Sequence, residues 1–217
     1  MDNLIFPEIP FSGFKGVLLD IDNTIYHYES SHKQALSLLM EEMSKLLTFS
    51  EETIKIEFLK SREIVNKRLY DTASSHSRFL YIQLTLEKIL GFSDFHNTLK
   101  LEKLYWDTFL SSMKLNKSAK RFIFECNSKN IPICCVTDLT ADIQFRKLMK
   151  LNLENKIKYI VTSEEVGIEK PNKKIFEKAL EKLNLKSNQV IMIGDSAPKD
   201  ILGGEALGIK SYLVKTK

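Results

Sequence analysis

The stretch Gly16-Val-Leu-Leu-Asp20-Ile-Asp22-Asn-Thr24 joins a short apolar run to a group of polar side chains. An apolar run that does not alternate with polar residues predicts a strand over 16–20 that is buried on both faces, as in a parallel sheet. In an open parallel sheet, ligands bind beyond the carboxyl ends of the strands. Asp20, Asp22 and Thr24 are therefore expected at the ligand-binding edge of such a sheet.

The second half of the chain repeats this pattern. Four more apolar runs occur at 131–137, 158–162, 190–195 and 209–214. Helical patterns separate them at 118–129, 141–151, 171–183 and 198–207, and Pro171 and Pro198 are expected in the first turns of the last two. Strands that alternate with helices predict an α/β fold with a Rossmann-like parallel sheet.

The segment between the first and second strands has a different character. It contains no proline between Phe11 and Ile131 and no glycine between Val17 and Leu90. Apolar residues recur there at helical spacing, which predicts helices at 30–48, 51–70, 76–90 and 97–113, the second with Ser50 as its N-cap. We therefore expect a core formed by 1–25 and 115–217, with an inserted all-helical domain at 26–114.

Composition excludes several classes of protein. The 217 residues are 43% hydrophobic and 28% charged, which is ordinary for a soluble globular protein. No apolar run approaches the roughly 18 residues that a membrane span requires. The net charge of +4 is spread along the chain, which argues against a nucleic-acid partner. The N-terminus does not resemble a signal peptide, and Cys126, Cys134 and Cys135 are expected to be buried thiols, so we expect a cytoplasmic protein.

Polar residues follow three of the expected strands and would converge at one edge of the sheet. Carboxylates gathered there repel one another unless a cation lies among them, and Mg²⁺ prefers such oxygen ligands. Lys170 would add a fixed positive charge, and the Thr137 hydroxyl precedes a helix N-terminus that favours phosphate. Each residue alone has an ordinary explanation as a cap, a turn or a solvated side chain. Together they favour phosphoryl transfer.

Four motifs in this order resemble the haloacid dehalogenase (HAD) superfamily of phosphotransferases. They are DIDNT at 20–24, Thr137 at the end of ICCVT, Lys170 in EKPNKKIF, and GDSAPKD at 194–200. The helical insert after the first motif is similar to the C1 cap of that superfamily. The phrases around Lys170 and Asp195 are similar to its branch of pyrimidine nucleotidases and N-acylneuraminate-9-phosphatases.

The resemblance implies a reaction in two steps. Asp20 would be the nucleophile that forms an aspartyl-phosphate, and Asp22 the general acid and then the general base. Mg²⁺ would be held by Asp20, the Asp22 backbone carbonyl and Asp195. Haloalkanoate dehalogenases of the superfamily lack an acid at the position of Asp22, because halide leaves without a proton. Asp22 therefore favours phosphate monoesters as substrates.

The remaining motif residues would bind or support the phosphoryl group. The resemblance assigns Thr137, Asp138 and Lys170 to phosphate binding. Asp200 would orient Lys170 or a metal-bound water, and Thr24 would shape the loop under the phosphate. Relatives mostly carry Asn or a small residue where this chain has Asp138. A carboxylate there would repel phosphate unless its side chain turns away.

We therefore expect a Mg²⁺-dependent phosphatase acting on a small phosphorylated metabolite, either a sugar phosphate or a nucleoside 5′-monophosphate. A phosphomutase and a non-catalytic binding protein of the same fold are the alternatives. The choice of substrate would lie in the cap, where Tyr70, His76 and Arg78 are candidate contacts. The competing explanation is that the segment around them only joins two helices, with Ser74 or Ser75 as the next N-cap. The sequence carries no expectation about oligomeric state.

Overall fold

The computed structural model describes residues 4–216, and these fold into two compact units. One unit holds the described residues up to Tyr28 and from Met113 onward, and we call it the core. The other, Glu29–Ser112, is entirely helical and is called the cap.

The core is built on a five-stranded sheet in the order β4-β3-β2-β5-β6. All four pairings are parallel, which confirms the expected α/β fold. The strands are β2 (Gly16–Leu19), β3 (Ile133–Thr137), β4 (Tyr159–Thr162), β5 (Val190–Gly194) and β6 (Lys210–Leu213). The central strand β2 pairs Leu19 with Cys135 on one side and with Ile193 on the other. Asp20, which follows β2, therefore lies at the edge of the sheet between the ends of β3 and β5.

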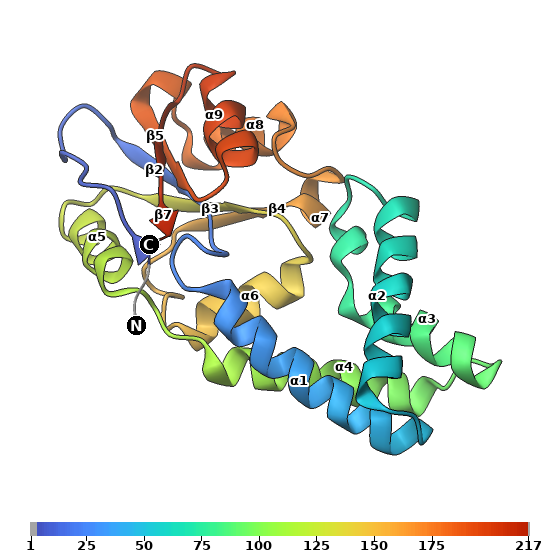
Figure 1. The fold of residues 1–217 in the computed structure, drawn as a ribbon. Coiled ribbons are helices and arrows are strands. Elements are labelled where there is room, and N and C mark those ends of the chain that lie inside the picture. The colour runs from blue at the N-terminus through green and yellow to red at the C-terminus, as the bar shows by residue number, and fades with distance from the viewer. Residues whose placement is uncertain (1–3, 217) are drawn as a thin grey trace. The chain divides into compact units, whose positions relative to one another are not determined.

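Helices cover both faces of this sheet. In Figure 1, α5 (Lys117–Ser128) and α6 (Ala141–Lys150) lie on one face, and α8 (Lys173–Leu183) and α9 (Leu202–Glu205) lie on the other. Shorter elements complete the core: β1 (Leu4–Ile5) with its partner β7 (Lys215–Thr216), α7 (Ser163–Val166), η2 (Ser187–Gln189) and η3 (Ala197–Ile201). Leu18, Cys134 and Met192 of neighbouring strands pack with Phe176 of α8 in a fully buried cluster.

Two details of the core bear on the expectations from sequence. Pro198 lies in the first turn of η3, as expected. Pro171 does not open a helix, because α8 begins only at Lys173, where the Asn172 side chain accepts a hydrogen bond from the backbone N–H of Lys174. The three cysteines are free and buried, also as expected.

The cap contains α1 (Tyr28–Leu47, which begins at the last core residue), α2 (Glu51–Arg68), η1 (Ala73–His76), α3 (Arg78–Leu90) and α4 (Phe95–Ser112). Ser50 is the N-cap of α2, as expected, and accepts a hydrogen bond from the N–H of Thr53. The expectation that Ser74 or Ser75 caps the next helix is wrong. Ser77 caps α3 instead, because residues 73–76 form a separate 3₁₀ turn before it.

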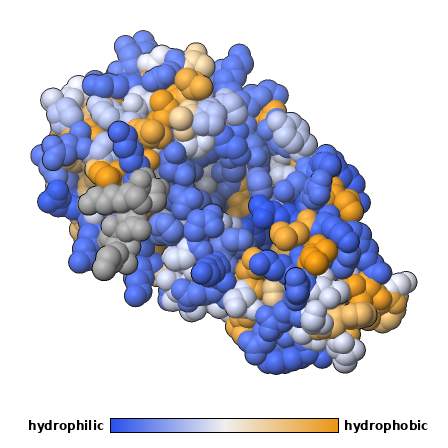
Figure 2. All heavy atoms as spheres, viewed as in Figure 1, coloured by the Kyte–Doolittle hydropathy of each residue, from blue (hydrophilic) through white to orange (hydrophobic). Residues whose placement is uncertain are grey.

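Apolar residues on the surface form small groups among hydrophilic ones in the view of Figure 2. Within residues 4–216, none of the helices combines the length and the apolar character that crossing a membrane requires.

Candidate active site

Asp20 follows the central strand and is nearly inaccessible, with 5% of its surface exposed. Its N–H donates to the carbonyl of Ile193, which continues the pairing between β2 and β5. One carboxylate oxygen, Oδ1, accepts from Lys170 Nζ at 2.6 Å, and the other, Oδ2, accepts from the Thr24 hydroxyl at 2.8 Å. Thr24 lies four residues further along the same loop, in which Asn23 has a φ of 58°. Both oxygens of Asp20 are therefore held in fixed directions.

Lys170 is the cation at the centre of this group. Its ammonium contacts Asp20 at 2.6 Å, Asp200 at 2.7 Å and the Val136 carbonyl at 3.1 Å, and only 4% of its side chain is exposed. Burial by itself would lower the pKa of Lys170, but the carboxylates of Asp20 and Asp200 raise that pKa well above its usual range. Lys170 is therefore held as a fixed positive charge.

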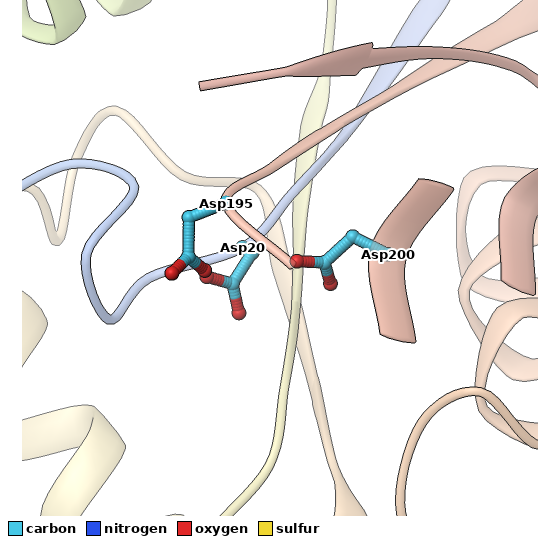
Figure 3. A group of neighbouring side chains, drawn as sticks. All are labelled: Asp20, Asp195 and Asp200. Carbon is cyan, nitrogen blue, oxygen red and sulfur yellow. The ribbon is translucent and has the colours of Figure 1, made fainter. Parts of the chain in front are cut away.

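Three carboxylates meet beside this lysine. Figure 3 shows Asp20, Asp195 and Asp200 turned toward one another, and their nearest oxygens all lie within 4.8 Å. Burial, and then the charge of Asp200, raise the pKa of Asp195 to about 6, although Lys170 opposes this. Burial likewise raises the pKa of Asp20, and Lys170 only partly offsets it.

These residues fit a hard divalent cation. Hard cations such as Mg²⁺ take carboxylate oxygens together with water and phosphate oxygens. A cation would also relieve the repulsion that raises the pKa of Asp195. The carboxylate group includes Asp200, which was not among the ligands expected from sequence, namely Asp20, Asp195 and the backbone carbonyl of Asp22. The side chain of Asp22 contacts Lys147 instead.

Gly194, at the end of β5, makes the position of Asp200 possible. A Cβ added at Gly194 would lie 2.2 Å from Asp200 Oδ2, far inside van der Waals contact. Asp200 Oδ2 instead accepts a hydrogen bond of 3.0 Å from the N–H of Ser196. The glycine of the GDSAPKD motif therefore provides the space for the carboxylate that binds Lys170.

Thr137 and Asp138 leave the neighbouring strand, β3. Thr137 is 1% exposed, and its hydroxyl accepts from Gln144 Nε2 at 2.7 Å. The Asp138 carboxylate turns to the backbone N–H of Lys170, at 3.0 Å, and to Lys199 Nζ, at 2.8 Å. Lys199 therefore offsets the charge that appeared unfavourable beside a phosphate site.

Asp22 has a set of partners that the sequence analysis missed. Lys147 Nζ donates to its two carboxylate oxygens at 2.6 and 2.8 Å, and Gln144 Nε2 donates at 3.2 Å. The Tyr26 hydroxyl donates to Oδ1 as well. Burial would raise the pKa of Asp22, but Lys147 and these hydrogen bonds lower it below its usual value.

A signal for Gln144 and Lys147 is present in the sequence. Both lie on the buried face of α6 together with Ile143 and Leu148. An amide and an ammonium on the apolar stripe of an amphipathic helix are unusual, because buried polar groups require partners. Sequence alone does not tell which partner each one has.

The three candidate residues of the cap, Tyr70, His76 and Arg78, differ in their contacts and in their exposure. Arg78 Nη1 donates to the His76 carbonyl at 2.6 Å, so these two are in contact, whereas Tyr70 is 82% exposed. Arg78 Nε also donates to the Tyr105 hydroxyl at 3.3 Å, and His32 Nδ1 lies 2.7 Å from that same hydroxyl. The guanidinium also lies 5.6 Å from the ring centres of Tyr105 and Trp106. Arg78 is therefore held by aromatic neighbours that the sequence analysis did not select.

Comparison with known proteins identifies the family of this chain. The family model of haloacid dehalogenase-like hydrolases matches residues 14–208, which covers most of the chain. This chain belongs to that family. It is therefore a hydrolase, and the strand-end carboxylates lie in the part of the chain that the family model covers.

Individual relatives support this assignment. A ribulose-1,5-bisphosphate 5-phosphatase of Halopiger xanaduensis is 32% identical over 198 residues, covering 91% of this chain and 83% of that protein. The pyrimidine 5′-nucleotidase YjjG of Escherichia coli is 42% identical over 81 residues, covering 37% of this chain and 36% of that protein. A HAD phosphatase structure from Thermococcus onnurineus has a TM-score of 0.71 at 21% identity, covering 92% of this chain and 86% of that one, and so shares the fold.

Proposed function

We propose that this protein is a Mg²⁺-dependent phosphatase that hydrolyses small phosphate monoesters through an aspartyl-phosphate on Asp20. The observation that carries this proposal is the environment of the Asp20 carboxylate, which is bonded to Lys170 and Thr24 and lies beside Asp195 and Asp200. A buried carboxylate with both oxygens directed by donors suits an in-line nucleophile.

The first step would form a bond between an Asp20 oxygen and phosphorus while the bond from phosphorus to the ester oxygen breaks. Asp22 would give a proton to the departing alkoxide. Burial would raise the pKa of Asp22 in the free protein but Lys147 lowers it, so the carboxylate would take up that proton as the negatively charged phosphate ester binds. In the second step Asp22 would take a proton from water, whose oxygen attacks phosphorus and releases inorganic phosphate and free Asp20. Lys170 and the Thr137 hydroxyl would bind the transferring phosphoryl oxygens.

Asp20, Asp195 and the backbone carbonyl of Asp22 would hold the Mg²⁺, with Asp200 beside them. The bound cation would neutralise charge on the phosphoryl group and on the carboxylates that surround it. Asp138 would contribute its backbone rather than its carboxylate, because that carboxylate is bonded to Lys199 and to the N–H of Lys170.

Among substrates we favour a sugar phosphate over a nucleoside 5′-monophosphate. The sugar-bisphosphatase relative matches 198 of the 217 residues, an alignment that necessarily runs through most of the cap. The nucleotidase relative matches 37% of the chain. Because a cap encloses the part of the substrate beyond the phosphate, similarity there bears more on substrate choice than similarity in the core.

In the cap we propose that Arg78 and His76 contact the substrate beyond its phosphate, with Tyr70 as a more exposed candidate. The ring contacts that hold Arg78 would preserve its direction for bidentate binding of an anionic group. H76A and R78A should raise KM for the native substrate and leave an aryl phosphate nearly unchanged. K67A is the matched control, because Lys67 is an exposed residue of α2 with 77% of its side chain accessible.

The decisive experiment is a phosphate-release screen over pentose phosphates, sugar bisphosphates, nucleoside monophosphates and p-nitrophenyl phosphate, with D20N as the inactive control. Mg²⁺-dependent release that D20N abolishes supports the proposal. An isomeric product without free phosphate would indicate the phosphomutase instead. No turnover on any substrate would favour the non-catalytic binding protein, although both Asp20 and Asp195 are present.

A further inference from the structure

The structure points to a positioning residue that the four motifs do not contain. We propose that Lys147, assisted by Gln144, holds the Asp22 carboxylate in the orientation that proton transfer requires. This inference rests on the proposed function, because it assigns Lys147 a role only if Asp22 is the acid and base of the reaction. It adds a fifth segment, α6, to the residues that determine catalysis.

The hydrogen bonds to Asp22 are directed at both of its carboxylate oxygens. Lys147 lies 125 residues from Asp22 in sequence, yet its ammonium reaches both carboxylate oxygens, at 2.6 and 2.8 Å. Gln144, one turn earlier on α6, donates to Oδ2 at 3.2 Å, and the Tyr26 hydroxyl donates to Oδ1. Three side chains from two segments therefore restrict both side-chain torsions of Asp22.

Stability alone is a poor explanation for these residues. Lys147 and Gln144 are both 0% exposed, where an aliphatic side chain would satisfy the buried face of α6. A buried ion pair is often no more stable than apolar residues of similar volume. Gln144 Oε1 is also buried and finds no hydrogen-bond partner within residues 4–216, which disfavours folding. The donors of both residues therefore have a use outside packing.

Gln144 also connects Asp22 to the expected phosphate site. The same Nε2 group lies 2.7 Å from the Thr137 hydroxyl and 2.8 Å from the Asp138 carbonyl. The side-chain amide of Gln144 therefore hydrogen-bonds both the Asp22 carboxylate, which follows β2, and the Thr137 hydroxyl at the end of β3. Proton transfer needs donor and acceptor within hydrogen-bond reach, and an error of about 1 Å can cost about 100-fold in rate.

The test compares K147M, K147R and the matched control K150M, which removes an exposed lysine from the same helix. Each is assayed with an alkyl phosphate, whose alkoxide needs a proton, and with p-nitrophenyl phosphate, whose phenolate needs less help. We expect K147M to lower kcat for the alkyl phosphate by about 10- to 100-fold, with KM changed by less than about threefold. The aryl phosphate should lose less, K147R should recover part of the rate, and K150M should match the wild type.

A double-mutant comparison separates positioning from general damage. Because Lys147 acts through Asp22, K147M should add little to D22N, and the two losses should not multiply. Equal losses on both substrates, or full multiplication with D22N, would overturn the inference. If K147M does not fold, Q144M is the alternative variant, because it removes the amide donors and leaves no buried charge without a partner. Q144M should likewise lower kcat for the alkyl phosphate more than for the aryl phosphate.

The outcome also distinguishes this inference from the proposed function. If D22N itself slows alkyl and aryl phosphates equally, the assigned role of Asp22 fails and the proposed mechanism fails with it. If D22N selectively slows the alkyl phosphate and neither K147M nor Q144M does, the mechanism stands and the role of Lys147 is wrong.

Discussion

Replacing Lys170 with methionine should destabilise the core strongly, even with no substrate or metal present. Lys170 Nζ lies 2.6 Å from Asp20 and 2.7 Å from Asp200, and these carboxylates are 5% and 1% exposed. Methionine keeps much of the volume of the side chain but removes its charge. The variant therefore leaves two buried carboxylates without the cation that both of them contact.

The size of the loss can be bounded from two directions. Removing one partner from a buried ion pair costs about 3–5 kcal/mol. A stranded carboxyl can instead take up a proton, which at pH 7 costs about 1.4 kcal/mol for each pH unit above its usual pKa of about 3.9, or about 4 kcal/mol. The two figures agree, so we expect K170M to lose about 4 kcal/mol, a large part of the roughly 5–15 kcal/mol that domains possess.

The assay is urea unfolding of the protein at pH 7 with EDTA, monitored by far-UV circular dichroism. K173M is the control, because Lys173 has 70% of its side chain exposed and its ion pair with Glu177, at 3.7 Å, should be worth less than about 1 kcal/mol. Adding D200N to K170M should restore about 2 kcal/mol, since it removes one of the two stranded charges. A loss below about 1 kcal/mol in K170M, or no recovery with D200N, would refute the account of Lys170 as the required cation.

Three further predictions concern the metal, a glycine and the cap. EDTA should abolish phosphate release and Mg²⁺ should restore it, because Asp195 and Asp200 crowd Asp20; turnover that survives excess chelator would contradict the metal site. G194A should lower kcat by at least about 10-fold and destabilise the core by about 1–3 kcal/mol, because its Cβ would displace Asp200, and G194A with wild-type kinetics would show that Asp200 can move freely. Burial, and then Arg78, lower the pKa of His32 to about 4, so the unfolded chain binds a proton between pH 6.5 and about 4 that the native cap does not. Cap stability should therefore fall as pH drops through that window, and H32N should flatten the pH dependence of Tm; an unchanged slope in H32N would assign the effect to another group.

The order of elements in the core was predictable from local pattern. Continuous apolar runs marked β2, β3 and β5 to within two residues, because a strand covered on both faces has no polar side to alternate. The outer strands β4 and β6 are partly exposed and carry a weaker apolar pattern. The capping serine before Glu51 was also predictable, since an N-cap depends on hydrogen bonds within one turn. The capping of α3 was not, because the 3₁₀ turn before it involves contacts outside that turn: the Tyr81 hydroxyl donates to the Ser75 carbonyl.

The candidate active site also has features that the sequence predicts and features that it does not. The shared position of Asp20, Thr137 and Asp195 at one edge of the sheet follows from the amino-acid pattern, because the carboxyl ends of parallel strands lie at the same edge whatever packs around them. Three pairings depend on the folded arrangement: Lys147 contacts Asp22, Lys199 contacts Asp138, and Gly194 leaves space for Asp200. These pairings join side chains from segments that the chain order does not relate, and the strength of a charge pair depends on separation and burial, which no spacing along the chain specifies.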